Sequence, residues 1–288
     1  MLLEESQWRL CERQHQVRVQ PWIKPRLERR RRGERDPVDD FLFEYYPYSP
    51  AKLATWHPGS GFTLRGDTSQ LLAGGGYRTW PEGIRVDPEV FVGKKDRLDL
   101  AVRILAGTQD RPAMVNCFGL HEWAMVYRLD PKQIRHSDQP LRLSPARIAA
   151  TVEDLGLRCT HIDAYRFFTD SAVPMNALTP TRASQPELEQ PGCLHANMDM
   201  YKYAMWFQAY VGSELAADCF ELAREARTLD MRASPYDMSS FGLESIPIEH
   251  TSGRAAYVQQ QRLLIDRSEP LRHRLVQVLR GLQDDLRL

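Results

Sequence analysis

The chain has 288 residues, of which 42% are hydrophobic, enough to bury a core that needs no disulfide or metal to hold it. Its 38 basic and 38 acidic side chains cancel, so overall charge gives no reason to expect nucleic acid or a membrane surface as a partner. No apolar run reaches the roughly 18 residues of a membrane span, the N-terminus lacks a secretion signal, and the odd number of cysteines favours reduced thiols. We therefore expect a cytoplasmic globular protein.

The N-terminal segment, at about 3–35, predicts a basic helical arm. Apolar side chains recur among charged ones over residues 3–20, and Pro21 is expected to end this helix before a second one over 22–32. Six arginines gather near the end of the arm: Arg26, Arg29, Arg30, Arg31, Arg32 and Arg35. Because arginine side chains match phosphate oxygens, the arm is a candidate for nucleic-acid binding, with a solvated helix face as the alternative.

The remaining pattern is mainly helical. Residues 36–50 predict a short buried helix, and residues 57–86 predict loops with a small hairpin, in which His57 either caps a turn or joins a site elsewhere. Further helices are expected near 88–107, 118–128, 144–155, 194–210, 213–230, 252–267 and 269–285, with extended segments near 77–86 and 158–168. Without repeats or a low-complexity linker, residues 1–288 predict a single globular helical domain, mainly α with minor β structure.

Three Cys-His pairs stand out between residues 117 and 199. In the first, Cys117 precedes His121 and Glu122, and Gly119 suggests a turn that presents both side chains at the start of a helix. In the third, Cys193 precedes His195, and Asp199 follows four residues later on the same helix face. Such pairing favours a site assembled from several segments.

The second pair begins with Cys159 and His161. If this segment is extended, the alternation of side chains places Cys159, His161, Asp163 and Tyr165 on one face. Each of the three histidines thus has an acid within four residues after it. The cysteines themselves are explained equally well as small core residues.

Imidazole, thiolate and carboxylate groups are the usual ligands of zinc and iron. We predict that His121, His161 and His195 bind a divalent metal. Glu122, Asp163 and Asp199 are expected to be further ligands or catalytic groups that orient the imidazoles and move protons, and Tyr165 is a further catalytic candidate. Two histidines with a carboxylate would suit non-haem iron, whereas three histidines with water would suit zinc hydrolysis.

Other charged residues are candidates for substrate binding. Asp230 and Arg232 lie in a dense charged segment, and Arg182 lies in the polar loop 179–191; an ion-pair network and an ordered connector are the alternatives. Asp218, Glu221 and Glu225 form a helical stripe that indicates either a two-metal carboxylate site or a solvent-exposed face. Together these features predict an iron-dependent oxidoreductase acting on a small anionic or aromatic substrate, with a non-catalytic binding protein as an alternative.

Three phrases carry a resemblance to a known family. They are residues 39–46 (DDFLFEYY), 118–128 (FGLHEWAMVYR) and 190–199 (QPGCLHANMD). The chain resembles, over nearly its whole length, actinobacterial and cyanobacterial proteins often labelled 3-methyladenine DNA glycosylase. The resemblance implies, as a second possible activity, base release from alkylated DNA. In that case the arginine arm would hold backbone phosphates, and Tyr45, Tyr46 and Trp123 would stack on an extruded base.

Overall fold

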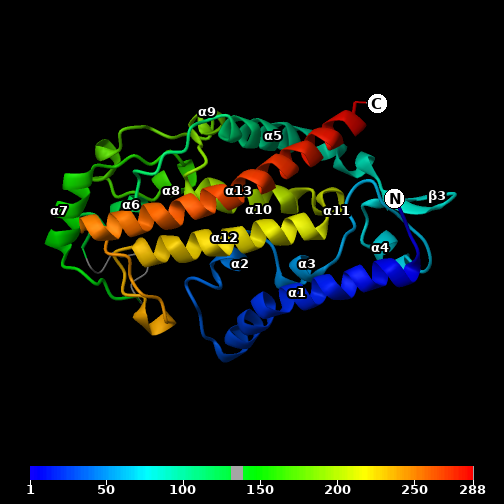
Figure 1. The fold of residues 1–288 in the computed structure, drawn as a ribbon, viewed down its shortest axis with the longest axis horizontal. Coiled ribbons are helices and arrows are strands. Elements are labelled where there is room, and N and C mark those ends of the chain that lie inside the picture. Colours follow the sequence, from blue (N-terminus) through cyan, green and yellow to red (C-terminus); the bar gives the residue numbers. More distant parts are fainter. Residues whose placement is uncertain (131–138, 288) are drawn as a thin grey trace. The chain divides into compact units, whose positions relative to one another are not determined.

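The computed structural model of the protein describes residues 1–130 and 139–287. Helices make up 60% of it and the strands form one small sheet, which confirms the predicted mainly α fold (Figure 1). The chain divides into two compact units, the first formed by Met1–Leu105, Met200–Glu221 and Leu271–Leu288, and the second by Ala106–Asp199 and Leu222–Pro270. The single domain stays a prediction, because this division does not show whether the units fold separately.

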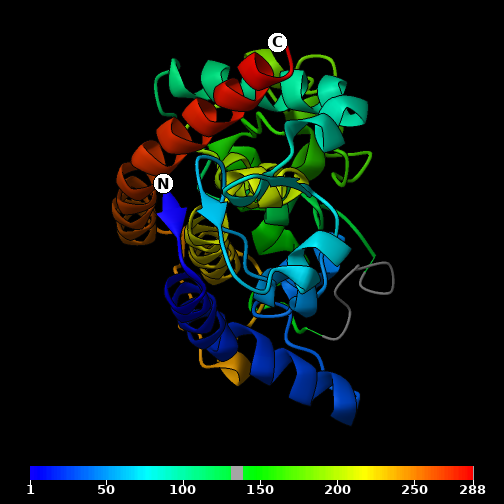
Figure 2. The ribbon, with the colours of Figure 1, turned by 90° about the vertical axis from the view of Figure 1, so that its right-hand side faces the viewer.

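The first unit contains the sheet. Its strands follow the order β1-β2-β4-β3 and comprise β1 (Leu2–Leu3), β2 (Thr63–Leu64), β3 (Tyr77–Trp80) and β4 (Gly83–Val86). β1 runs parallel to β2, and the blue and cyan strands lie side by side in Figure 2. β3 and β4 form the predicted antiparallel hairpin, with Tyr77 opposite Val86. Gly83 is required there, because a Cβ atom would lie 2.2 Å from the carbonyl oxygen of Leu64.

Helix α1 is the longest element of the first unit. The helices wholly within this unit are α1 (Glu5–Arg32), α2 (Phe41–Tyr45), α3 (Pro50–Ala54), the 3-10 helix η1 (Pro88–Lys94), α4 (Ser69–Ala73) and α11 (Gln208–Val211). α1 begins with a capping box between Glu4 and Gln7 and ends at Gly33, whose φ is 71°. The expected break at Pro21 is wrong, since α1 continues through it. Burial of Trp8 and Val19 along the helix offsets the cost of an internal proline, about 3 kcal/mol.

Acidic side chains neutralise much of the basic arm. Asp40 is buried and lies 2.9 Å from Arg26 and 2.5 Å from Arg29. Burial opposes ionisation of Asp40, but the hydrogen bonds from Arg29 outweigh it and lower the pKa of the carboxyl. Glu44 pairs with Arg35, and Arg32 pairs with Glu34. These contacts support the solvated, ion-paired interpretation of the arm, and its binding to nucleic acid stays a prediction.

The carboxylate stripe of helix α12 (Ser213–Ala233) is also ion-paired. In the first unit, Arg18 lies 2.7 Å from Asp218 and 3.2 Å from Glu221. In the second unit, Glu225 pairs with Arg267. Among residues 1–130 and 139–287, none of these acids belongs to a cluster of potential metal ligands. These ion pairs support the solvent-exposed alternative for this stripe, and the two-metal site stays a prediction.

The second unit is built from short helices and parts of longer ones. Its own helices are α6 (Leu120–Ala124), α7 (Pro145–Leu155), α8 (Ile162–Tyr165), η3 (Val173–Met175), α9 (Gln185–Leu188) and η4 (Ser239–Phe241). Both units share residues of α5 (Lys95–Gln109), α10 (Leu194–Trp206), α12 and α13 (Thr251–Asp285). The two helices predicted over 252–285 are one, because α13 continues through Pro270. Within the described ranges, no helix is both long and apolar enough to cross a membrane.

The expected extended segment over 158–168 is wrong beyond its first residues. His161 is the N-cap of α8, where its Nδ1 accepts a hydrogen bond from the backbone N–H of Asp163. The chain turns into a helix at that point, so Asp163 and Tyr165 do not continue the face of a strand. A capping side chain thus overrides the alternating pattern.

Candidate metal centre

The three predicted histidines come together inside the second unit. The ring centroid of His195 lies 4.7 Å from that of His121 and 5.4 Å from that of His161. His121 comes from α6, His161 from the N-cap of α8, and His195 from the first turn of α10. The predicted convergence of three separate segments is therefore present in the structure.

The segments that carry His121 and His195 are each held by a close contact with another part of the backbone. Gly119 begins α6 with a φ of 70°, as the predicted turn requires, and the indole N–H of Trp123 donates to the carbonyl oxygen of Ala233 at 2.8 Å. Before α10, a Cβ atom on Gly192 would lie 2.2 Å from the carbonyl oxygen of Met114. Gln190 joins the same two segments, because its side-chain oxygen accepts hydrogen bonds from the backbone N–H groups of Met114 and Gly192.

His121 belongs to a cluster with Glu122 and Asp230. Each residue offers a ligand atom, and these atoms all lie within 4.8 Å of one another. The Nε2 atom of His121 approaches Oδ1 of Asp230 to 2.8 Å. These two atoms thus face each other within the cluster, whereas Oε2 of Glu122 is a buried atom with no hydrogen-bond partner among the described residues. Buried polar atoms are normally paired, so Oε2 of Glu122 is an exception within this cluster.

Arg227 occupies the other side of the same two carboxylates. Its Nη1 atom donates to Oε1 of Glu122 at 2.8 Å and to Oδ2 of Asp230 at 2.9 Å. Each carboxylate therefore uses one oxygen for Arg227 and keeps the other within the cluster. Two carboxylates thus face one guanidinium, and a protonated His121 would balance the second negative charge.

The charges of this cluster shift its pKa values in opposite directions. Burial opposes protonation of His121, but the nearby carboxylate of Asp230 outweighs it and raises the pKa of the imidazole. Burial likewise opposes ionisation of Asp230, but His121 and Arg227 outweigh it and lower the pKa of the carboxyl. Asp230 is therefore an anion at neutral pH, paired with both His121 and Arg227.

His161 belongs to a second cluster with Glu189 and Asp199. Its Nε2 atom lies 2.9 Å from Oε1 of Glu189 and 3.4 Å from Oδ2 of Asp199, and all three residues are buried. Burial opposes protonation of His161, but the two carboxylates outweigh it and raise its pKa to about 10. The amide of Gln185 also donates to Glu189, at 2.5 Å.

The tautomer of His161 follows from its capping bond. Because Nδ1 accepts from the N–H of Asp163, the proton of the neutral ring is on Nε2, between the two carboxylates. A nitrogen that carries a proton has no lone pair for a metal. In this arrangement the second cluster holds a proton, and a metal there would require His161 to give up its cap.

His195 stands beside both clusters. Burial lowers the pKa of this histidine well below its ordinary value, and the charges of His121 and His161 lower it further. The ring is therefore neutral at physiological pH. A neutral imidazole can either bind a metal or accept a proton.

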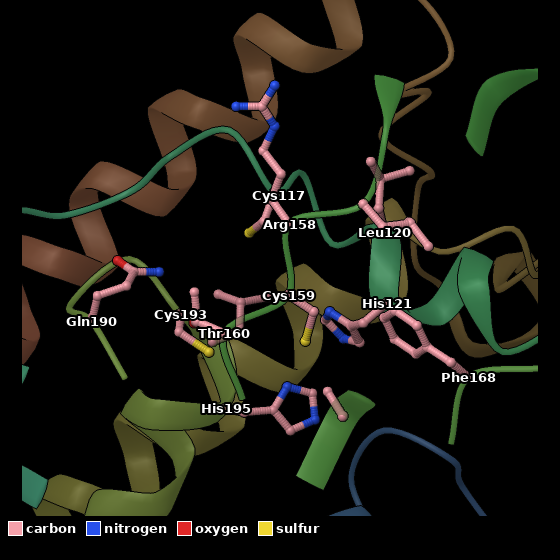
Figure 3. A pocket seen from close by; sticks show the side chains of 13 residues that line it. Cys117, Leu120, His121, Arg158, Cys159, Thr160, Phe168, Gln190, Cys193 and His195 are labelled. Atoms are coloured by element: carbon pink, nitrogen blue, oxygen red, sulfur yellow. The ribbon is translucent and has the colours of Figure 1, made fainter. Parts of the chain in front are cut away.

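The three paired cysteines line a small cavity with His121 and His195 (Figure 3). The cavity measures about 20 Å³, and Figure 3 shows the two imidazole rings with the thiols of Cys159 and Cys193 near them. Burial raises the pKa of Cys117, Cys159 and Cys193, and that of Cys159 reaches about 12. Within the described part of the chain, no cysteine belongs to either ligand cluster. These cysteines are thus protonated wall residues rather than preformed metal ligands.

The other predicted site residues have different neighbours. Asp163 binds Arg182, with one N–O distance of 2.9 Å, and Arg166 at 3.1 Å. The ring of Tyr165 packs against Phe168, and Arg232 donates to the carbonyl oxygen of Glu244. Asp163 and Tyr165 touch His161 only through their backbone N–H groups, so the catalytic and substrate-binding roles of these side chains stay predictions.

His57 lies in the first unit and is held there by local contacts. Its Nδ1 atom lies 2.8 Å from the hydroxyl oxygen of Tyr77, and its backbone N–H donates to Ser213. These bonds support the structural alternative for this histidine.

Sequence reasoning missed two members of the clusters. The sequence pattern assigns no site role to Glu189, which lies in the polar loop 179–191, or to Arg227, which lies near the charged residues Asp230 and Arg232. No local spacing links Glu189 to His161 or Arg227 to Glu122, since each pair meets only through the tertiary fold. Asp230 was predicted to bind substrate, whereas it lies in the cluster of His121.

Comparisons with family models, curated proteins and solved structures gave no match. The family resemblance of the three sequence phrases therefore stays a prediction.

Proposed function

We propose that the protein is a metal-dependent enzyme, an iron-dependent oxidoreductase whose metal is held by His121, Glu122 and Asp230. The observation that carries this proposal is the convergence of one imidazole and two carboxylates within 4.8 Å, in which Oε2 of Glu122 has no hydrogen-bond partner among the described residues. Nitrogen and carboxylate donors without thiolates suit iron better than a structural zinc site. Bound iron would supply one-electron redox chemistry and positions open to a small reactant.

The surrounding residues have roles that follow from their contacts. Arg227 fixes the outer oxygens of Glu122 and Asp230 and so orients their inner oxygens. His195, which is neutral, can take up a proton next to this set. We assign His161 with Glu189 and Asp199 to holding a proton, because the cap of His161 competes with metal binding. Zinc in the same set would instead favour hydrolysis.

Metal analysis of tag-free protein tests the proposal. We expect close to one iron per chain in the wild type and its loss in His121→Ala and Asp230→Asn, which remove one donor each. His250→Ala is the matched control, since His250 is an exposed histidine of the same unit. Circular dichroism of each variant separates loss of metal from loss of fold. A wild type with less than about 0.1 metal per chain, far below the content of a dedicated site, would contradict the proposal.

The DNA glycosylase activity stays a second prediction. In the described ranges, the contacts of the arm give it no separate support, because Arg26 and Arg29 already bind Asp40. Release of free base from alkylated duplex DNA by metal-free protein would favour it over the oxidoreductase. A fold and stability that chelators leave unchanged, with no metal bound, would instead favour a non-catalytic binding protein.

A further inference from the structure

A hollow on the surface of the second unit lies between helices α12 and α13. Its volume is about 500 Å³, and most of its surface is apolar. The parts of the two helices that belong to this unit run in opposite directions beside it (Figure 1). Leu229 and Leu264 line it and are almost fully buried. All of its lining residues belong to the second unit, so the hollow is a feature of that unit alone.

Leu263 exposes an apolar side chain at this hollow. It is 53% exposed, the highest fraction for a large hydrophobic side chain among the described residues of the second unit. A single exposed leucine is ordinary on a protein surface, but an exposed leucine beside an apolar hollow is typical of an interface. A surface that combines a projecting apolar side chain with a hollow to receive one is complementary in shape to itself.

The two ends of the hollow carry opposite charges. At one end Glu225 and Arg267 pair with each other, which leaves the negative charge of Asp266 unbalanced there. Because the helices are antiparallel, Arg232, seven residues after Glu225, lies at the other end. Gln260, seven residues before Arg267, lies at that same end and is uncharged. Arg232 donates to a backbone carbonyl oxygen, and within residues 1–130 and 139–287 neither Arg232 nor Asp266 forms an ion pair.

We propose that this face of α12 and α13 binds a second copy of the chain, related to the first by a two-fold axis near Leu263. Every contact of a two-fold interface occurs twice, so Asp266 of each copy meets Arg232 of the other. Leu263 lies midway between the two ends, three residues after Gln260 and three before Asp266, and enters the hollow of the other copy. The opposite charges of the two ends select this partner, because a copy turned by half a revolution presents its basic end to the acidic one. The inference does not depend on the proposed metal.

Size-exclusion chromatography with light scattering on the full-length protein tests for the dimer. Over about 1 to 100 µM, where weaker protein interfaces associate, we expect the mass to rise from 33.3 kDa towards twice that value. Because each dimer buries Leu263 twice, Leu263→Gln should raise the dissociation constant at least about tenfold. Val17→Gln is the matched control, since Val17 is 73% exposed on α1 and belongs to the other unit.

Two results of this measurement would overturn the proposal. A wild type that stays monomeric over the whole range would leave the hollow to a different protein or to a small ligand. Equal dimerisation of the wild type and Leu263→Gln would place the contact between copies on another face.

An exchange of charges tests the two-fold arrangement itself. Asp266→Lys gives a copy with two basic ends, and Arg232→Glu gives a copy with two acidic ends. Each variant should be monomeric alone, because like charges then face each other at both ends. An equimolar mixture should form a dimer again, because both ends then pair opposite charges. With the fold of both variants checked by circular dichroism, a mixture that stays monomeric, or a dimer formed as tightly as the wild type by either variant alone, would overturn the proposal.

Discussion

Burial of His57 links the stability of the first unit to pH. Burial, together with the charges of His15 and Lys52, lowers the pKa of His57 to about 4. The unfolded chain takes up this proton near the ordinary histidine value of about 6.5, so it binds more protons than the folded chain between these two values. Stability is therefore lost as the pH falls from about 6.5 towards 4.

We expect His57→Gln to remove this acid sensitivity. Between about pH 7.5 and 4.5 the wild type should lose roughly 2 to 3 kcal/mol more unfolding free energy than the variant, the worth of a shift of this size. Urea unfolding at both pH values measures the difference. His250→Gln, at an exposed histidine, should respond to acid as the wild type does. An identical acid response of wild type and His57→Gln would show that His57 titrates normally in the folded protein.

At the residue scale, the sequence predicts which histidines meet and that Glu122 accompanies His121, but not which acids the other two histidines face. Helical spacing placed His195 and Asp199 on one face, and adjacency placed Glu122 beside His121. In the structure Asp199 faces His161 instead, whereas Glu122 stays in the cluster of His121 and also binds Arg227. Partners far apart in the chain leave no periodic signal, so spacing alone could not assign them.

Gly192 controls how closely two elements of the site approach. An alanine there would place its Cβ atom 2.2 Å from the carbonyl oxygen of Met114, a backbone atom that cannot move alone. We expect Gly192→Ala to lower the unfolding free energy by about 3 kcal/mol, as overpacking does. It should also lower metal content, because displacement of the start of α10 moves His195 relative to His121.

Urea unfolding and metal analysis of Gly192→Ala check this expectation. The control is Gly93→Ala, since a Cβ atom at Gly93 meets nothing within 4 Å and its backbone is not in the left-handed region. Unchanged stability of Gly192→Ala would show that the two segments separate at little cost. Equal losses in both variants would mean that the loss reflects glycine removal in general and not this contact.

At the scale of elements, the sequence located most helices but not their ends. The break expected at Pro21 and the division of residues 252–285 into two helices are both absent, because α1 continues through Pro21 and α13 through Pro270. Prediction from local sequence includes the hydrogen bond that a proline removes from a helix. It does not include the burial of helix side chains in the folded protein, which offsets the cost of that lost bond. The same limit explains residues 158–168, where a side-chain cap at His161 replaced the extended pattern.

On the scale of the whole molecule, the candidate site lies within one unit. Both ligand clusters and the cavity are formed by residues of Ala106–Asp199 and Leu222–Pro270. The sheet and the arginine arm belong to the other unit. The sequence shows no linker at this division, because α10, α12 and α13 contribute residues to both units.

This division predicts where metal binding should stabilise the protein. A ligand that binds only the folded state raises the free energy of unfolding by about 2.7 kcal/mol when its concentration is a hundred times its Kd. Amide hydrogen exchange detects this gain in the segments that bind the ligand, because those segments open less often. We expect Fe(II), added without oxygen, to slow amide hydrogen exchange in α6 and in residues 222–233 of α12, which carry His121, Glu122 and Asp230. The β3–β4 hairpin should exchange at an unchanged rate, and Asp230→Asn should abolish the effect in α6. Equal slowing of the hairpin would place the metal elsewhere or show that both units open together, and either result would contradict a response confined to the second unit.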